Sequence, residues 1–176
     1  MNSVSKPGRF RCAYLCMAAF CVLVVCFLAG GCGQAGKGDG PSVEGITLDV
    51  REVGETLFHD LEYRDQLEEL PPSVVFTLLG IEEKDVAAQM NYFSSGATAE
   101  EILVFQAQNE DARETLAQLI ENRNADQSEV YASYAPEEVR YLHGAVLAQK
   151  GEYLIYCVSA DHAAAEKLIN GVLGNT

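Results

Sequence analysis

The chain opens with a pattern of charge and hydrophobicity that differs from everything after it. The basic residues Lys6, Arg9 and Arg11 come first, and no acidic residue occurs before position 32. Residues 12–28 (CAYLCMAAFCVLVVCFL) then form an uncharged apolar run, which the small residues AGG separate from Cys32. A basic start, an apolar middle and small residues before a cut are typical of a secretory signal.

The end of this segment distinguishes a cleaved signal from a membrane anchor. The apolar run alone would also suit a single transmembrane helix. Three small residues in succession, however, let an extended backbone enter a peptidase groove, and a thiol follows at once. We therefore predict a signal peptide over residues 1–31, cleaved between Gly31 and Cys32. An uncleaved anchor and ordinary secretion are the alternatives.

Beyond position 45 the first periodic pattern is helical. Apolar residues at helical spacing predict a helix that Thr47 could cap. These are Val50, Val53, Leu57, Phe58 and Leu61. The sequence PPS at residues 71–73 then begins a short second helix, and Gly80 ends it.

The spacing of apolar residues next changes to every second position, which is typical of a β-strand. Residues 86–94 alternate, with Gln89 and Asn91 expected on a wet face, and residues 102–106 are predicted to return as the neighbouring strand. A helix starts at Asn109, with a break possible around residues 122–126, and Pro136 begins one more helical turn.

Two strands and a helix complete the pattern. Residues 142–149 and 152–159 are predicted strands joined at Lys150-Gly151, and a last helix starts near Asp161. The order of elements predicts an α+β domain over residues 46–173. N-terminal helices would precede two strand–strand–helix units, which form an antiparallel sheet with helices on one face.

The positions of glycine and cysteine residues predict a linker and exclude an internal disulfide in the domain. Five glycines among residues 33–45 predict a flexible linker, so residues 32–45 would join the cut to the domain. Five of the six cysteines lie at or before Cys32, which leaves Cys157 alone in the domain and allows no internal disulfide. We expect a buried, inert thiol at Cys157, with a reactive thiol as the alternative.

Charge excludes some partners. All 26 acidic residues and nine of the 12 basic ones follow position 31, which gives that part a net charge of about −17. Such a surface repels nucleic-acid phosphates and anionic headgroups, so neither is an expected direct ligand. A solvated acidic surface is the plain interpretation, and a cation site or a site for basic peptides is the alternative.

Catalytic and metal-binding patterns are missing from the sequence. It has no nucleophile elbow, metalloprotease helix, paired CxxC or calcium-loop spacing. His59, His143 and His162 are far apart in the chain and are interpreted as surface or capping residues. The clusters Glu82-Glu83-Asp85 and Glu137-Glu138 are interpreted as helix-start carboxylates. We therefore expect no catalytic residue, no metal and no cofactor.

The sequence AGGC at residues 29–32 resembles the lipobox of bacterial lipoproteins, with Ala29 where leucine is usual. The resemblance implies that Cys32 receives a thioether-linked diacylglycerol, a palmitate-type anchor, and becomes the new N-terminus. Two acyl chains, at about 0.8 kcal/mol for each buried methylene, can hold a protein on a membrane. The expected location is thus the outer face of the cell membrane.

The domain also resembles a known family. The motifs are GATAEEILVF at residues 96–105, SYAPEE at 133–138 and KGEY at 150–153. Together they are similar to bacterial lipoproteins of the family called domain of unknown function 4358. The resemblance covers roughly residues 46–173 and implies a membrane-attached, extracytoplasmic domain. It brings no activity and no catalytic positions, although the step Ala99-Glu100-Glu101 could be functional.

Three classes of function fit these features. The first is a non-catalytic binding or accessory lipoprotein of the cell envelope, acting on an envelope protein or a small ligand. The second is an envelope enzyme, hydrolase-like, that uses converging carboxylates or a histidine. The third is a purely structural role. A concave pocket with a buried carboxylate beside His143 or His162 would favour the enzyme.

Overall fold

The computed structural model describes residues 46–175. The predicted signal peptide, its cleavage site at Gly31, the lipidation site Cys32 and the linker at residues 32–45 all lie outside the described residues. Within the described part, no helix combines the length and the apolar character needed to cross a membrane.

The described residues form a five-stranded antiparallel sheet with helices. The strands are β1 (Glu68–Glu69), β2 (Val86–Phe93), β3 (Glu101–Ala107), β4 (Val146–Lys150) and β5 (Tyr153–Val158). The α-helices are α2 (Val50–Asp60), α3 (Pro72–Leu79), α4 (Glu110–Tyr134), α5 (Val139–His143) and α6 (His162–Leu173). The strands lie in the order β1-β2-β3-β5-β4, so β3 occupies the middle. The α+β class is confirmed.

Strands β3 and β5 are buried on both faces, and their alternating side chains belong to two separate cores. Leu103 pairs with Tyr156 in the register, and both belong to the core beneath α3 and α4. Ile102 pairs with Cys157, and both belong to the core beneath α2 and α6. A continuous apolar strand requires cover on both faces, and the helices provide it.

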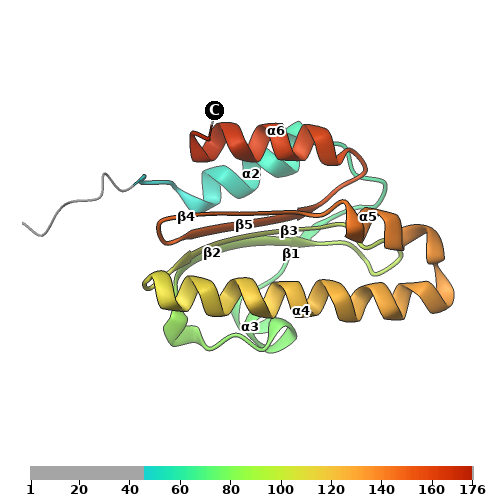
Figure 1. Cartoon of the computed structure of the whole chain (residues 1–176), viewed down its shortest axis with the longest axis horizontal. Helices are drawn as coiled ribbons and strands as arrows, with labels where there is room; N and C mark the ends of the chain where they lie inside the picture. Colours follow the sequence, from blue (N-terminus) through green and yellow to red (C-terminus); the bar gives the residue numbers. More distant parts are fainter. Residues whose placement is uncertain (1–45, 176) are drawn as a thin grey trace, which may run out of the picture. The chain divides into compact units, whose positions relative to one another are not determined.

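The helices therefore form two layers, with the sheet between them (Figure 1). The expectation that helices cover one face of the sheet, with the helices after Asn109 and Asp161 side by side, is wrong. The helices that begin after Asn109 and Asp161 lie on opposite faces, because apolar side chains of β3 and β5 project to both sides and one layer could cover only half of them.

The helix starts and ends follow the predicted capping residues with two differences. Asp49, not Thr47, caps α2, and its carboxylate accepts from the backbone N–H groups of Arg51 and Glu52. Helix α4 begins after the cap Asn109 and continues to Tyr134 without the possible break at residues 122–126. The predicted helix end at Gly80 and the predicted helix start near Asp161 are confirmed.

The strands differ more from the prediction. Residues 139–143 are the helix α5, so the strand expected from Leu142 begins only at Val146. The face of β2 expected to be wet is not wet at Asn91, which is buried and accepts a hydrogen bond from the backbone N–H of Val104. The two-residue strand β1 pairs with β2 and was not predicted, because two exposed glutamates carry no strand pattern.

The strand that carries Cys157 is an interior strand of the sheet. All six residues of β5 are buried, and β3 and β4 flank it. Burial raises the pKa of the Cys157 thiol to about 12, which disfavours the reactive thiolate. The hydroxyl of Tyr63 lies 3.8 Å from the sulfur. This environment supports the inert thiol and not the reactive one.

A glycine brings α2 close to the sheet. A Cβ atom added at Gly54 would lie 2.5 Å from Cγ of Met90 and 3.0 Å from its Cβ. Both distances are too short for carbon atoms in contact. Helix α2 therefore rests on β2 at a distance that only glycine permits, and this accounts for a residue that otherwise lowers helix stability by about 1 kcal/mol.

We predict that Gly54→Ala lowers the free energy of unfolding by about 1–3 kcal/mol, because overpacking against Met90 outweighs the gain in helix propensity. The matched control is Gly171→Ala in α6, where the new methyl group meets no atom within 4 Å. That change should raise stability by up to about 1 kcal/mol. Chemical denaturation of both variants measures the two signs. Equal stabilisation by both substitutions would contradict the close contact.

Candidate functional site

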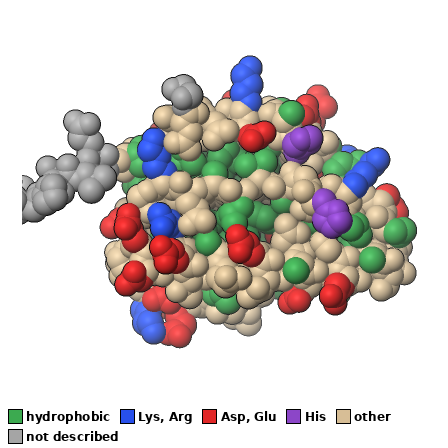
Figure 2. Space-filling model, viewed as in Figure 1, with side chains coloured by type: hydrophobic (Ala, Val, Ile, Leu, Met, Phe, Trp, Pro, Cys, Tyr) green, Lys and Arg blue, Asp and Glu red, His purple; other side chains and the backbone are tan. Residues whose placement is uncertain are grey.

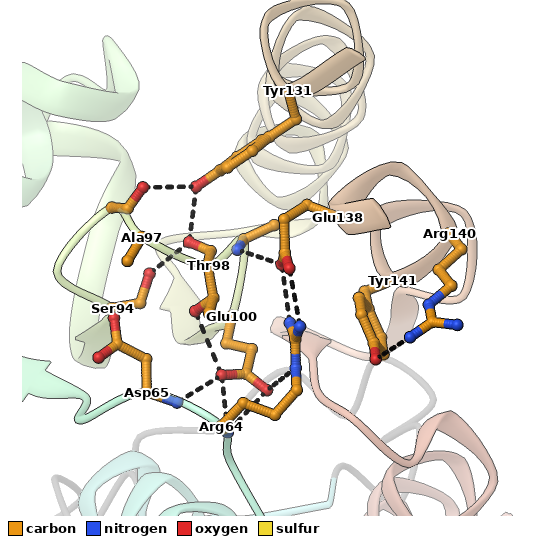
Figure 3. Close-up of polar contacts among 12 residues, drawn as sticks. Arg64, Asp65, Ser94, Ala97, Thr98, Glu100, Tyr131, Glu138, Arg140 and Tyr141 are labelled. Atoms are coloured by element: carbon orange, nitrogen blue, oxygen red, sulfur yellow. Dashed lines mark hydrogen bonds and ion pairs between the residues drawn. The ribbon is translucent and has the colours of Figure 1, made fainter. Parts of the chain in front are cut away.

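A cluster of charged side chains, two buried carboxylates around one partly exposed arginine, lies where three segments of the chain meet. Arg64 belongs to the segment that follows α2, Glu100 stands just before β3, and Glu138 ends the single 3-10 turn that precedes α5. Figure 3 shows Arg64 pointing toward both carboxylates. The side chain of Glu100 is 0% exposed and that of Glu138 is 3% exposed, so both charges are removed from water.

The contact between Arg64 and Glu138 is bidentate. Nη1 donates to Oε1 and Nη2 donates to Oε2, each over 2.7 Å. Oε2 of Glu138 also accepts from the backbone N–H of Ala99 over 2.9 Å. Short parallel bonds between a guanidinium and a carboxylate are among the stronger hydrogen bonds of proteins, and they fix the orientation of both groups.

Glu100 accepts from four donors. Its carboxylate takes hydrogen bonds from the backbone N–H groups of Arg64 and Asp65 and from Nε of Arg64. The hydroxyl of Thr98 donates to Oε2 over 3.2 Å. Glu100 thus holds the backbone of the segment after α2 against the start of β3. A buried carboxylate needs this full set of donors, because an unpaired charge in the interior is costly.

An aromatic ring covers the guanidinium. The central carbon of Arg64 lies 3.7 Å from the ring centroid of Tyr141 in α5. Arg140 approaches the same ring at 4.6 Å, and its Nη2 donates to the hydroxyl of Tyr141. The ring thus adds a cation–π contact to the ion pairs and ties α5 to the cluster.

A second buried pair follows in the sequence. Nη2 of Arg123 in α4 donates to Oε2 of Glu101 over 3.0 Å, and Nε donates to Oε1 over 3.4 Å. Glu101 is buried at the first position of β3. Successive residues of the chain therefore bind different partners, Glu100 the segment after α2 and Glu101 the helix α4.

The loop before β3 is bound to the end of α4. The hydroxyl of Tyr131 donates to the carbonyl oxygen of Thr98 over 2.6 Å, and the hydroxyl of Tyr134 lies 3.5 Å from the carbonyl oxygen of Gly96. Gly96 has a φ of 93°, a conformation that side chains disfavour. The hydroxyl of Ser95 and its backbone N–H donate to Asp65. The loop is thus held from both sides.

The pKa shifts of the two buried pairs have opposite directions. Hydrogen bonds from Arg64 hold the pKa of Glu138 below its ordinary value, and the backbone N–H of Ala99 contributes to the same effect. Burial raises the pKa of Glu101, although the Arg123 charge opposes the shift. The carboxylate of Glu138 is therefore stabilised in its charged form more fully than that of Glu101.

The structure places the predicted candidates as follows. All three histidines are exposed, and Figure 2 shows histidine side chains at the surface of the face it displays. His143 ends α5, His162 begins α6 and His59 lies in the last turn of α2. Within residues 46–175, no group of three or more metal-ligating side chains comes together. The histidines and the buried carboxylates are separate features.

The sequence indicated part of this cluster. The step Ala99-Glu100-Glu101 was noted, and Glu137-Glu138 was interpreted as a helix-start pair. The structure instead buries Glu138 as the partner of Arg64. Arg64 and Arg123 were not predicted as partners, because no local spacing links them to carboxylates 22 to 74 residues away in the chain. The one available signal was two acidic residues directly before a buried apolar strand.

The described residues define an α+β domain with one sheet between two helical layers and an internally paired charge cluster at one end of β3. A family model described as Domain of unknown function (DUF4358) matches residues 73–159, from α3 to just beyond β5, and the chain belongs to this family. Neither the comparison with curated proteins nor that with solved structures found a match. The matched part contains Glu100 and Glu138, whereas Arg64 precedes it.

We predict opposite pH effects for the two carboxylates. The lowered pKa of Glu138 contributes stability above the pKa of an unfolded glutamate and loses it as the pH falls below about 5. Glu138→Gln should therefore cost about 3 kcal/mol at neutral pH, and this difference from the wild type should shrink in acid. The raised pKa of Glu101 has the reverse sign, so the wild type should gain stability relative to Glu101→Gln as the pH falls.

Urea denaturation of the wild type and both variants between about pH 3 and pH 7 measures these differences. Glu101→Gln is the matched control, since it makes the same chemical change in a buried, arginine-paired glutamate one residue after Glu100. The assignment fails if both differences change in the same sense with pH.

Proposed function

We propose that this chain is a lipoprotein of the cell envelope, anchored through Cys32 to the outer face of the membrane, which acts as a non-catalytic binding or accessory protein. The N-terminal pattern supports the anchor: a basic start, an apolar run and the residues AGGC. A glycine-rich linker would then hold the domain away from the headgroups. The lipid anchor makes the membrane its first partner, and an envelope protein or a small ligand is the second.

The observation that most favours a non-catalytic role is the pairing within the charge cluster. Each of the three buried carboxylates is bound to an arginine, and Glu100 and Glu138 also accept from backbone N–H groups. A general acid or base must exchange a proton with a substrate, which requires access and a pKa near the working pH. The lowered pKa of Glu138 is the reverse of what a general acid needs, and Glu101, whose pKa burial raises, is held by Arg123. The cluster suits a structural purpose better.

A hydrolase is the second candidate function, and it requires catalytic side chains that a substrate can reach. It would use converging carboxylates or a histidine, and Glu100, Glu101 and Glu138 do converge near the start of β3. All three histidines are exposed, whereas these carboxylates are buried. For Glu138→Gln, the enzyme hypothesis expects loss of an activity in a folded protein, whereas our proposal expects a change in stability alone.

We predict that cells grown with a clickable fatty-acid analogue label the wild-type chain and do not label Cys32→Ser. The thiol of Cys32 would be the attachment point of the diacylglycerol, and serine cannot form the thioether. Gel fluorescence measures the label, and membrane fractionation should show the wild type, but not the variant, in the membrane as a cleaved form. Cys157→Ser is the control, since it removes a buried thiol and should leave labelling unchanged. Equal labelling of wild type and Cys32→Ser would rule out the anchor.

A further inference from the structure

Exposed apolar side chains gather beside one groove. Four large apolar residues of residues 46–175 stand out as exposed, and three of them line the same cavity of about 430 Å³: Leu78 (47%), Val130 (58%) and Tyr134 (59%). The fourth, Val74, lies one turn before Leu78 on α3. The groove is bounded by α3, the C-terminal half of α4 and the loop at Gly96. Val130 is exposed and belongs to neither core cluster.

The groove also has polar groups that lack partners. Oε1 of Gln127 is buried, lines the groove and accepts no hydrogen bond from the protein. Arg123 lines it too and uses only Nε and Nη2 to bind Glu101. A polypeptide backbone offers a carbonyl oxygen that could accept a hydrogen bond from Nη1 of Arg123, which is not used in the contact with Glu101.

The charge of the groove favours one class of peptide over others. Asp126 lines the groove, is exposed and forms no ion pair within the described part of the chain. Arg123, the positive residue of the lining, is already neutralised by Glu101. The groove therefore has one uncompensated negative charge, in a chain with net charge −14. Complementarity favours a partner with a positive charge, and the surrounding acidic surface would speed its approach.

We propose that the groove between α3 and α4 binds an apolar peptide segment that carries a lysine or arginine, presented by another protein. Its apolar side chains would cover Leu78, Val130 and Tyr134, and its basic residue would pair with Asp126. The proposal deepens the binding role inferred above and names the class of its partner. A second copy of this chain is disfavoured as the occupant, because two strongly acidic molecules repel each other.

A random peptide display library, selected on the purified full chain in detergent micelles, tests the proposal. The enriched peptides should combine apolar residues with lysine or arginine. Their affinity, measured by fluorescence anisotropy, should fall about tenfold or more for Asp126→Lys and for Val130→Ser. The matched control is Glu166→Lys, which makes the same charge reversal at an exposed position of α6, in the other helical layer. It should leave the affinity within about twofold of the wild type.

Three results would overturn the proposal. The first is the absence of any enriched peptide. The second is an equal loss of affinity in Asp126→Lys and Glu166→Lys, which would indicate nonspecific attraction. The third is a dimer in sedimentation that Val130→Ser converts to a monomer, which would make the groove a contact between copies. Peptide binding in micelles does not depend on lipidation at Cys32, so failure of this test and failure of the anchor are distinguishable.

Discussion

Two parallel hydrogen bonds of 2.7 Å join Arg64 to Glu138, and the arrangement around β3 depends on this contact. Three segments meet there without strand pairing between them: the chain after α2, the start of β3 and the turn before α5. Bringing their charges out of water is costly, and the cost is offset only when every donor and acceptor has a partner. Glu100, which accepts from four donors, completes the set. Losing Arg64 would leave two buried carboxylates without a counter-charge.

This requirement links the site to the rest of the fold. Glu138 lies in the 3-10 turn that follows α4, and Arg64 lies in the segment that follows α2. The cluster therefore connects segments that follow helices from the two layers. The same loop that supplies Thr98 to Glu100 is bound by Tyr131 and borders the groove at Gly96. The charge cluster is buried and internally paired, whereas the groove is open and has unpaired polar groups. The cluster thus supports the loop, and the groove provides a surface for binding.

The sequence predicted the elements whose signals are local. The cap at Asn109, the glycine at 80 and the continuous apolar run of β5 each act on neighbouring residues, and each is confirmed. The failures concern relations between distant segments. The two helical layers could have been inferred from β5, whose apolar residues face both sides. The helical turn predicted from Pro136 continues through α5 to His143, and the signal that ends it, Gly144, was assigned to the following strand.

The candidate site was less predictable than the fold. Glu100 and Glu101 were visible as acidic residues directly before an apolar strand, an unusual position for two charges. Their partners were not visible, since Arg64 and Arg123 are separated from them by 36 and 22 residues. Glu138 gave a misleading signal, because glutamate after Pro136 is also what a simple helix start contains. The role of Glu138 as the partner of Arg64 follows from its burial in the folded structure and could not be inferred from sequence spacing.

A double-mutant cycle between Arg64→Met and Glu138→Gln measures the central interaction most directly. Arg64→Met leaves Glu100 and Glu138 buried without a counter-charge, whereas Glu138→Gln leaves Arg64 paired with Glu100 alone. The double change removes both charges of the Arg64–Glu138 pair together. We predict that the double variant is more stable than the sum of the single losses implies, with a coupling free energy of about 1–3 kcal/mol at neutral pH. A coupling indistinguishable from zero would contradict the account, since it would mean that the two residues stabilise the domain independently.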